Sequence, residues 1–152
     1  MSEDGILMKN ILSLWQFWAV LSAVFAAMTA IFAKVGIENI NSDFATFIRT
    51  VVILFVLGII LFATNQYQSL KTVSQKSLVF LVLSGIATGG SWICYFRALK
   101  IGNASQVVPI DKLSVVLVAL FGVIFLGERL SSADWIGIFL IASGAVVIAL
   151  RL

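Results

Sequence analysis

The sequence predicts an all-α integral membrane protein with five transmembrane helices, and two observations lead to this class. Hydrophobic residues make up 61% of the 152-residue chain and charged residues only 11%, against about 25% in an ordinary soluble domain. The apolar residues lie in runs close to the ~20 residues that a helix needs to cross a ~30 Å hydrocarbon core. A soluble domain of this size has no interior for so much apolar surface, so we expect one compact membrane domain.

The first predicted helix covers residues 15–33 and follows an N-terminal segment of residues 1–14. Its uncharged run extends from Asn10 to Ala33 and is longer than the 7–15 apolar residues usual in a secretory signal. Glu3 and Asp4 precede the run, where a signal peptide is expected to be positively charged. We therefore expect a retained transmembrane helix that begins a single membrane domain over residues 15–152.

Four more helices are predicted in order along the chain. The second, 44–63, follows a short polar loop in which Asn41 is a candidate N-cap. The third, 77–99, follows the longest polar connection, and the fourth, 105–126, has Pro109 in its opening turns, where proline is best tolerated. The fifth covers 135–150, after a turn around Gly127.

The cations that flank these spans are evenly divided. Five spans place the two chain ends on opposite sides of the membrane; we call the N-terminal side A and the other side B. Side A carries Lys9, Lys71, Lys76 and Arg129, and side B carries Lys34, Arg97, Lys100 and Arg151. Orientation is set by an imbalance in such residues. The even count favours dual topology, with copies inserted both ways; the alternative is a small bias hidden by the uncertainty of the helix ends.

Besides Arg97 in the last turn of the third helix, three charges fall within predicted spans near side B. Arg49 lies in the second helix, and Asp111 and Lys112 lie in the fourth, with Lys34 at the end of the first helix. Charges at such depth usually face a protein-lined or water-filled cavity. Consecutive residues of a helix point about 100° apart, so we expect Asp111 to pair with Arg49 and not with Lys112. The alternative is a purely structural ion pair beside a snorkelling lysine.

Aromatic and small residues add candidates for a cavity and for an interface. Trp18 in the first helix, and Trp92 and Tyr95 in the third, lie on faces that also carry hydroxyl groups, which suits an amphipathic cavity; ordinary packing is the alternative. Gly137 and Gly144 share one stripe of the fifth helix, where small side chains allow close helix contact. We expect this stripe to make a subunit contact, or else to pack within the monomer.

The composition also argues against several other classes of function. The chain has no histidine and one cysteine, so neither a metal site nor an intrachain disulfide is expected. No nucleophile–base pair or phosphate-binding loop is present, so we expect neither an enzyme nor a cofactor. The net charge of +3 includes no basic tract suited to nucleic acid.

Several motifs together carry a family resemblance. Residues 98–144 resemble the second part of an EamA domain, of the drug/metabolite transporter superfamily, and Arg49 resembles that family's arginine in the second span. The matching motifs are Ala104-Ser105, Leu126-Gly127-Glu128-Arg129-Leu130-Ser131, Trp135-Ile136-Gly137 and Ser143-Gly144. Many members carry a Glu-Pro pair where this chain has Ser114 and Val115. The charges at 111 and 112 come one turn earlier, as in a single-domain branch, and we place Ser114 with them on the predicted transport path.

The resemblance implies a half-sized secondary transporter in the cell (inner) membrane. Full-length relatives contain two such units of opposite orientation around a central path. A lone unit would therefore pair with a second copy, head to tail, or with a related chain. The expected activity is export of a small metabolite or drug, and the positive charge excess at positions 49, 111 and 112 favours an anionic or carboxylate-bearing substrate. The alternatives are a flippase for a lipid-linked substrate and a non-transporting subunit of a larger complex.

Overall fold

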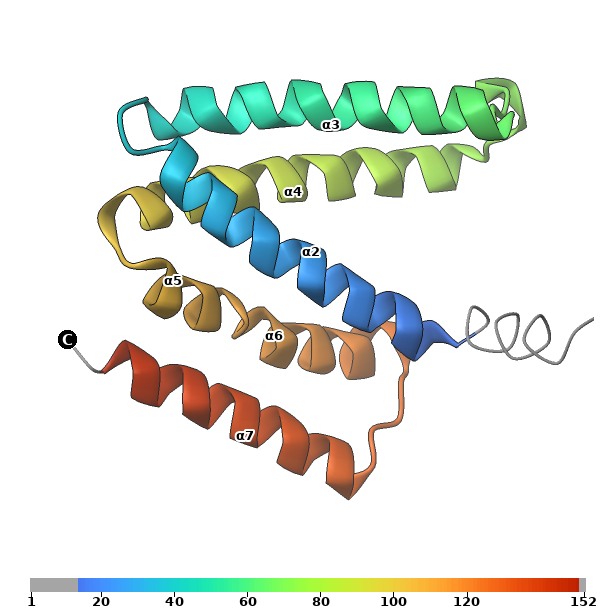
Figure 1. Cartoon of the computed structure of the whole chain (residues 1–152). Helices are drawn as coiled ribbons and strands as arrows, with labels where there is room; N and C mark the ends of the chain where they lie inside the picture. The colour runs from blue at the N-terminus through green and yellow to red at the C-terminus, as the bar shows by residue number, and fades with distance from the viewer. Residues whose placement is uncertain (1–13, 151–152) are drawn as a thin grey trace, which may run out of the picture.

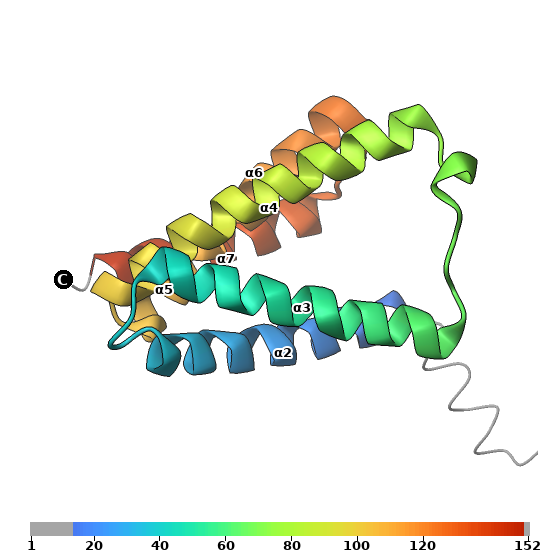
Figure 2. The same ribbon diagram turned by 90° about the horizontal axis from the view of Figure 1, so that it is seen from above.

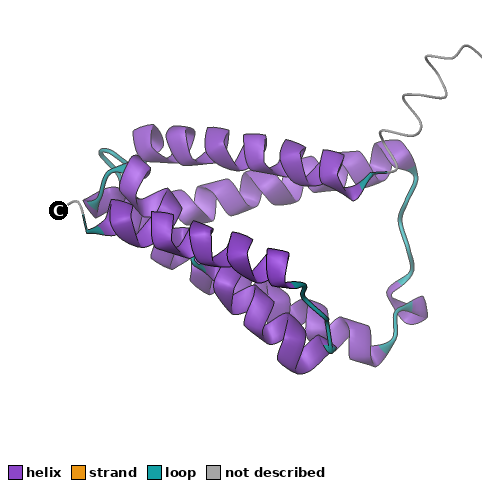
Figure 3. Cartoon of the chain, turned by 90° about the horizontal axis from the view of Figure 1, so that it is seen from below, coloured by secondary structure: helices purple, strands orange, loops and turns teal. Residues whose placement is uncertain are grey.

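The protein is seen in a computed structural model that describes residues 14–150 as helices joined by loops (Figure 3). Five helices in this range are long and apolar enough to cross a membrane, which confirms the predicted fold class. In chain order the spans are α2 (Trp15–Gly36), α3 (Ser42–Thr64), α4 (Gln75–Ile101), a divided fourth span (Ala104–Leu126) and α7 (Ser132–Ala149). A short 3₁₀ helix, η1 (Leu70–Thr72), lies in the α3–α4 connection. The four continuous helices begin and end within three residues of their predicted bounds.

The fourth span corrects the prediction of one continuous α-helix. It consists of α5 (Ala104–Asp111), α6 (Ser114–Phe121) and a π-helical turn, η2 (Gly122–Leu126). Between α5 and α6 the backbone tightens, because the amides of Leu113, Val115 and Val116 each donate to a carbonyl three residues back at 3.0 Å, as in a 3₁₀ helix. Pro109, just before this turn, has no amide hydrogen and leaves α5 one hydrogen bond short.

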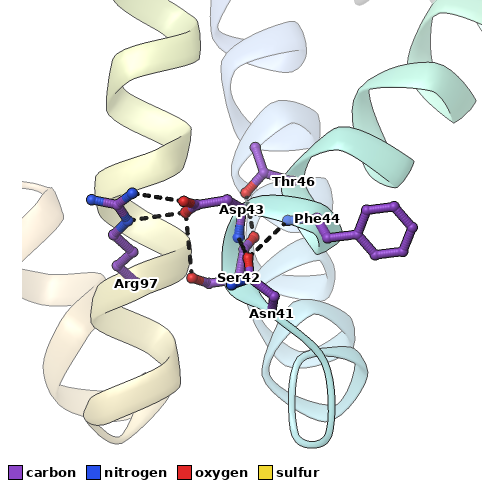
Figure 4. Close-up of polar contacts among 6 residues, drawn as sticks. All are labelled: Asn41, Ser42, Asp43, Phe44, Thr46 and Arg97. Atoms are coloured by element: carbon purple, nitrogen blue, oxygen red, sulfur yellow. Dashed lines mark hydrogen bonds and ion pairs between the residues drawn. The ribbon is translucent and has the colours of Figure 1, made fainter.

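The helix ends are capped by side chains and by one glycine. The Asn41 side chain, a predicted cap, accepts hydrogen bonds from the amides of Asp43 and Phe44 at 2.8 and 3.2 Å (Figure 4). Ser131 and Asp134 form a capping box that starts α7. Gly127 ends the fourth span at φ 68°, and the next amide, of Glu128, donates to the Gly122 carbonyl at 3.1 Å. The left-handed conformation at Gly127 is one that glycine adopts with least strain.

The helices pack tightly at side B and spread apart toward side A. Figure 1 shows α3 and α4 side by side, with α2 running diagonally from their closed end toward α6. Seen from above in Figure 2, α3 and α4 diverge toward the loop that contains η1. The buried cluster lies at the converging end and consists of Ile37, Ala45, Phe96 and Leu99. The bundle is therefore closed at side B and more open at side A.

Apolar side chains cover most of the outer surface. Within residues 14–150 few large side chains are buried, among them Ile37, Phe96 and Leu99, which are at most 3% exposed. Residues such as Leu54 and Phe62 are more than two-thirds exposed, at 72% and 79%. Lipid tails are as apolar as leucine, so these faces are suited to contact with the bilayer or with another membrane protein.

Candidate functional site

A cavity of about 480 Å³ lies among α2, α3, α4 and α5, within the size range of small-molecule sites. One wall is a stripe of small residues on α2, from Ala19 to Thr29. The rest of the lining, from the other elements, carries the charged and aromatic groups, and its members include Arg49, Ser91, Trp92, Tyr95, Asp111 and Lys112. The cavity thus brings together three charges from two separate spans with two of the aromatic residues predicted to accompany them.

Arg49 faces this cavity from α3 and stacks on aromatic rings of α4. Its guanidinium carbon lies 4.2 Å from the centre of the Trp92 ring and 5.5 Å from that of Phe96. Both distances are within the range of a cation–π interaction. In the part of the chain described, the ion pairs are Arg97–Asp43 and Lys112–Asp111, and Arg49 belongs to neither. The expected Arg49–Asp111 pair is therefore wrong, and the electron-rich faces of two rings stand in place of a carboxylate.

Asp111 pairs instead with its neighbour in sequence. Lys112 Nζ donates to Asp111 Oδ2 at 3.3 Å, which contradicts the expectation that adjacent residues point too far apart. That expectation assumed a regular helix, but Asp111 is the last residue of α5 and Lys112 begins the 3₁₀-like turn. Both side chains stay partly accessible, at 37% for Asp111 and 50% for Lys112, and both line the cavity.

The Asp111–Lys112 pair lies where the fourth span is interrupted, and a membrane restricts where such interruptions can occur. Backbone groups released from a regular helix are tolerated at membrane depth only where protein or a water-filled cavity satisfies them. Interrupted helices are also where secondary transporters bind substrates and coupling ions. The α5–α6 turn therefore places two charges at the cavity wall.

Three of the predicted path residues lie elsewhere. Trp18 does not line the cavity, although Ala19 beside it does; its ring packs edge-on against Phe17, with 5.5 Å between ring centres. Ser114 is exposed at the start of α6 and is likewise absent from the cavity wall. Lys34, which was expected to complete the charged layer, is turned toward the end of α4. The transport roles of all three remain predictions.

Lys34 and Lys100 join the ends of α2 and α4 at side B through reciprocal hydrogen bonds to backbone carbonyls. The Lys34 ammonium, from the last turn of α2, donates to the carbonyls of Leu99 and Gly102 at 2.7 and 2.8 Å. The Lys100 ammonium, from the last turn of α4, donates to the carbonyls of Ile37, Glu38 and Ile40 at 2.6–2.9 Å. A cation suits the unsatisfied carbonyls at a helix C-terminus, which explains why Lys34 is drawn away from the cavity.

A salt bridge that the sequence analysis missed joins α3 to α4 at the same end. Arg97 Nε donates to Asp43 Oδ1 at 2.9 Å, and Nη2 to Oδ2 at 2.6 Å (Figure 4). Figure 4 shows Arg97 reaching from α4 to the first turn of α3, beside the Asn41 cap. The signal was present in the sequence, because both residues flank spans on side B. From the sequence, Arg97 is predicted only as a cation that flanks the third span.

The two glycines of the predicted subunit contact lie on α7. A Cβ atom added at Gly137 or Gly144 would meet no heavy atom within 4 Å. Neither glycine is therefore needed for close helix packing within the monomer. Their role in a dimer remains a prediction.

Comparison with known proteins now places these features in a family. The profile of the EamA-like transporter family matches residues 13–150. The chain belongs to the EamA-like transporter family. It is 59% identical over 135 residues to a Sinorhizobium protein named "Uncharacterized transporter in cobO 3'region", a match that covers 89% of this chain and 96% of that one. No solved structure matches this chain.

Other proteins similar to this chain differ in length. A Methanocaldococcus jannaschii protein, "Uncharacterized protein MJ1333.1", is 30% identical over 86% of this chain and 92% of its own length. The Bacillus subtilis "Uncharacterized transporter YxxF" is 29% identical over 88% of this chain but only 42% of its own length. A region similar to this chain thus makes up nearly the whole of the first two relatives and less than half of YxxF.

Proposed function

We propose that this multi-pass EamA protein is one half of a secondary transporter, works as an antiparallel homodimer and exports a small anionic metabolite or drug across the cell (inner) membrane. The proposal includes no enzymatic activity: the charged groups at the cavity bind a solute and move it across the membrane. A heterodimer with a related chain would use the same site.

The observation that carries the proposal is the Arg49 guanidinium, which lines a cavity between membrane spans without a carboxylate partner in the described chain. A charge at membrane depth is costly unless something neutralises it. Asp111 and Lys112 neutralise each other, which leaves one positive charge for a ligand. A carboxylate or phosphate group matches a guanidinium in charge and geometry, and so an anionic substrate is favoured.

The dimer is supported by the relatives and by the open end of the bundle. YxxF has room for two units of this size, the arrangement in which inverted repeats form a central transport path. The Sinorhizobium relative has room for one. The spread of the helices at side A, together with the open space at Gly137 and Gly144, leaves apolar surface for a second copy.

The two alternatives differ in how the site supports them. A non-transporting subunit would have Arg49 and Asp111 buried and mutually paired, with no cavity between subunits. The absence of an Arg49–Asp111 ion pair in the described chain favours a transporter. A flippase for a lipid-linked substrate remains the second candidate, because an apolar groove between α2 and α3 adjoins Arg49. The two activities are distinguished by whether the translocated compound is water-soluble.

The test compares the compounds released by cells that express the wild-type protein, the Asp111→Asn variant or an empty vector, by untargeted mass spectrometry of the medium. We expect at least one anionic compound to accumulate outside only with the wild type. Both side chains of the Asp111–Lys112 pair are partly accessible and asparagine keeps the size and polarity of the aspartate, so the variant should reach the membrane in nearly normal yield. Equal losses of export and yield would assign Asp111 a structural role, and a wild-type profile equal to the empty vector would contradict export.

A further inference from the structure

A second pocket adjoins the cavity described above, and the two meet at Arg49. It is a groove of about 340 Å³ between α2 and α3, closed toward side B by the loop that joins them. Arg49 and Thr29 line both the cavity and the groove. The remaining lining is almost wholly apolar and includes Phe32, Gly36, Ile40, Ile48 and Phe96.

The guanidinium of Arg49 lies at the junction of these two environments. Of the two rings it contacts, Trp92 belongs to the polar cavity and Phe96 to the apolar groove. A charged group bound at Arg49 would therefore have polar partners on one side and hydrocarbon on the other. This is the arrangement of a site for an amphipathic ligand, in which apolar walls supply affinity and a few polar groups fix orientation.

We infer that the transported compound is an organic anion with an apolar tail, whose charged group binds Arg49 and whose tail lies in the α2–α3 groove. This inference rests on the proposed transport function and adds a substrate class to it. A small, fully polar anion would leave the groove empty, and a neutral apolar molecule would leave the guanidinium without a counter-charge. An amphipathic anion satisfies both requirements.

Gly36 provides a way to block the groove alone. It lines the groove near the end of α2, and an added Cβ would meet nothing within 4 Å. Leucine at this position would project into the groove without a backbone clash. Gly58 of α3 is a matched control, because its Cβ position is equally open and it lines neither the cavity nor the groove.

The test measures binding of butanoate, hexanoate and hexanamide to the protein in nanodiscs by equilibrium dialysis, with empty nanodiscs subtracted. Each methylene group transferred from water to an apolar site favours binding by about fourfold, so hexanoate should bind up to about fifteenfold more tightly than butanoate. The Gly58→Leu variant should keep this gain, Gly36→Leu should lose it while still binding butanoate, and Gly36→Ala should lose part of it. Arg49→Gln should bind neither acid, and hexanamide should bind weakly to every variant.

The outcomes separate this inference from the proposed function. If butanoate binds through Arg49 but the gain with chain length is absent, or survives in Gly36→Leu, the tail site is wrong and an anion transporter remains. If hexanamide binds as tightly as hexanoate, the charge requirement is wrong. If neither acid binds the wild type, the amphipathic-anion inference is overturned, while export itself is decided separately by the compounds in the medium. A change of oligomeric state in Gly36→Leu without a change in binding would assign the groove to a second copy.

Discussion

The Arg49 guanidinium stacks on Trp92 at 4.2 Å, and this contact determines how substitutions at position 49 should behave. The indole face holds the guanidinium in position and partly offsets the cost of its burial without neutralising its charge. The residue therefore stays able to bind an anion. A carboxylate partner at this position would have to be displaced before an anionic substrate could bind Arg49.

Replacement of Arg49 by lysine should weaken anion binding without abolishing it. The charge remains, but the planar group that stacks and binds bidentately is lost. A cation–π contact is worth about 0.5–2 kcal/mol, or roughly two- to thirtyfold in affinity. The measurement is the affinity for hexanoate in Arg49→Lys, Trp92→Leu and the double variant. Because the two residues act through one contact, the double variant should bind about as well as the weaker single one; fully additive losses would show that Trp92 does not position Arg49.

At the scale of elements, the fourth span is the part that departs from regular helix. A 3₁₀-like turn follows Asp111, and a π-helical turn precedes Gly127. Both departures coincide with features of the candidate site or of the family. The first presents the Asp111–Lys112 pair to the cavity, and the second ends at the start of the Leu126-Gly127-Glu128-Arg129-Leu130-Ser131 motif. The residues of that motif reverse the direction of the chain, because Gly127 ends the fourth span and Ser131 begins α7 as its N-cap.

Gly127→Ala should destabilise the protein, because its φ of 68° is strained for a residue with a Cβ. The expected loss is about 1–2 kcal/mol of the free energy of unfolding. Gly127→Asn should lose less, because asparagine tolerates this conformation better. Thermal unfolding in nanodiscs measures the effect, with Gly85→Ala in the interior of α4 as the control. If both alanine variants unfold at the same temperature, the turn does not require glycine.

At the scale of the whole molecule, the odd number of spans has a direct consequence. The five described spans begin on side A and end on side B. If a short linker joins the end of one copy to the start of another, the second copy must therefore begin on side B of the first and insert upside down. The product would have the two-unit length that the match to YxxF indicates.

Such a linked pair should export as well as the separate chains do, because its copies are antiparallel. The control is the same pair with an additional transmembrane helix in the linker, which forces the copies to be parallel. The assay is again the set of compounds released to the medium. Export by the parallel pair at equal yield would contradict the antiparallel dimer.

Much of this architecture could be predicted from the sequence, because in lipid the requirement to satisfy every backbone group within helices makes span positions a matter of length and hydropathy. The same reasoning identified Arg49, Asp111 and Lys112, since charges inside spans are rare. Their pairing could not be predicted. It depends on the break after Asp111, for which Pro109 is the only local signal, and on ring contacts between α3 and α4. Lys34 was misplaced because a helix-based estimate of depth does not show that its ammonium reaches the carbonyls at the end of α4.

The measurement that tests the antiparallel dimer most directly is the orientation of the chain in intact cells. Single cysteines are placed in a Cys94→Ser background, one at Gln68 in the side A loop and one at Asn39 in the side B loop, and labelled with a membrane-impermeant thiol reagent. Both positions are exposed. An antiparallel homodimer predicts that each position is labelled in part of the population. Complete labelling at one position and none at the other would establish a single orientation and contradict the antiparallel homodimer.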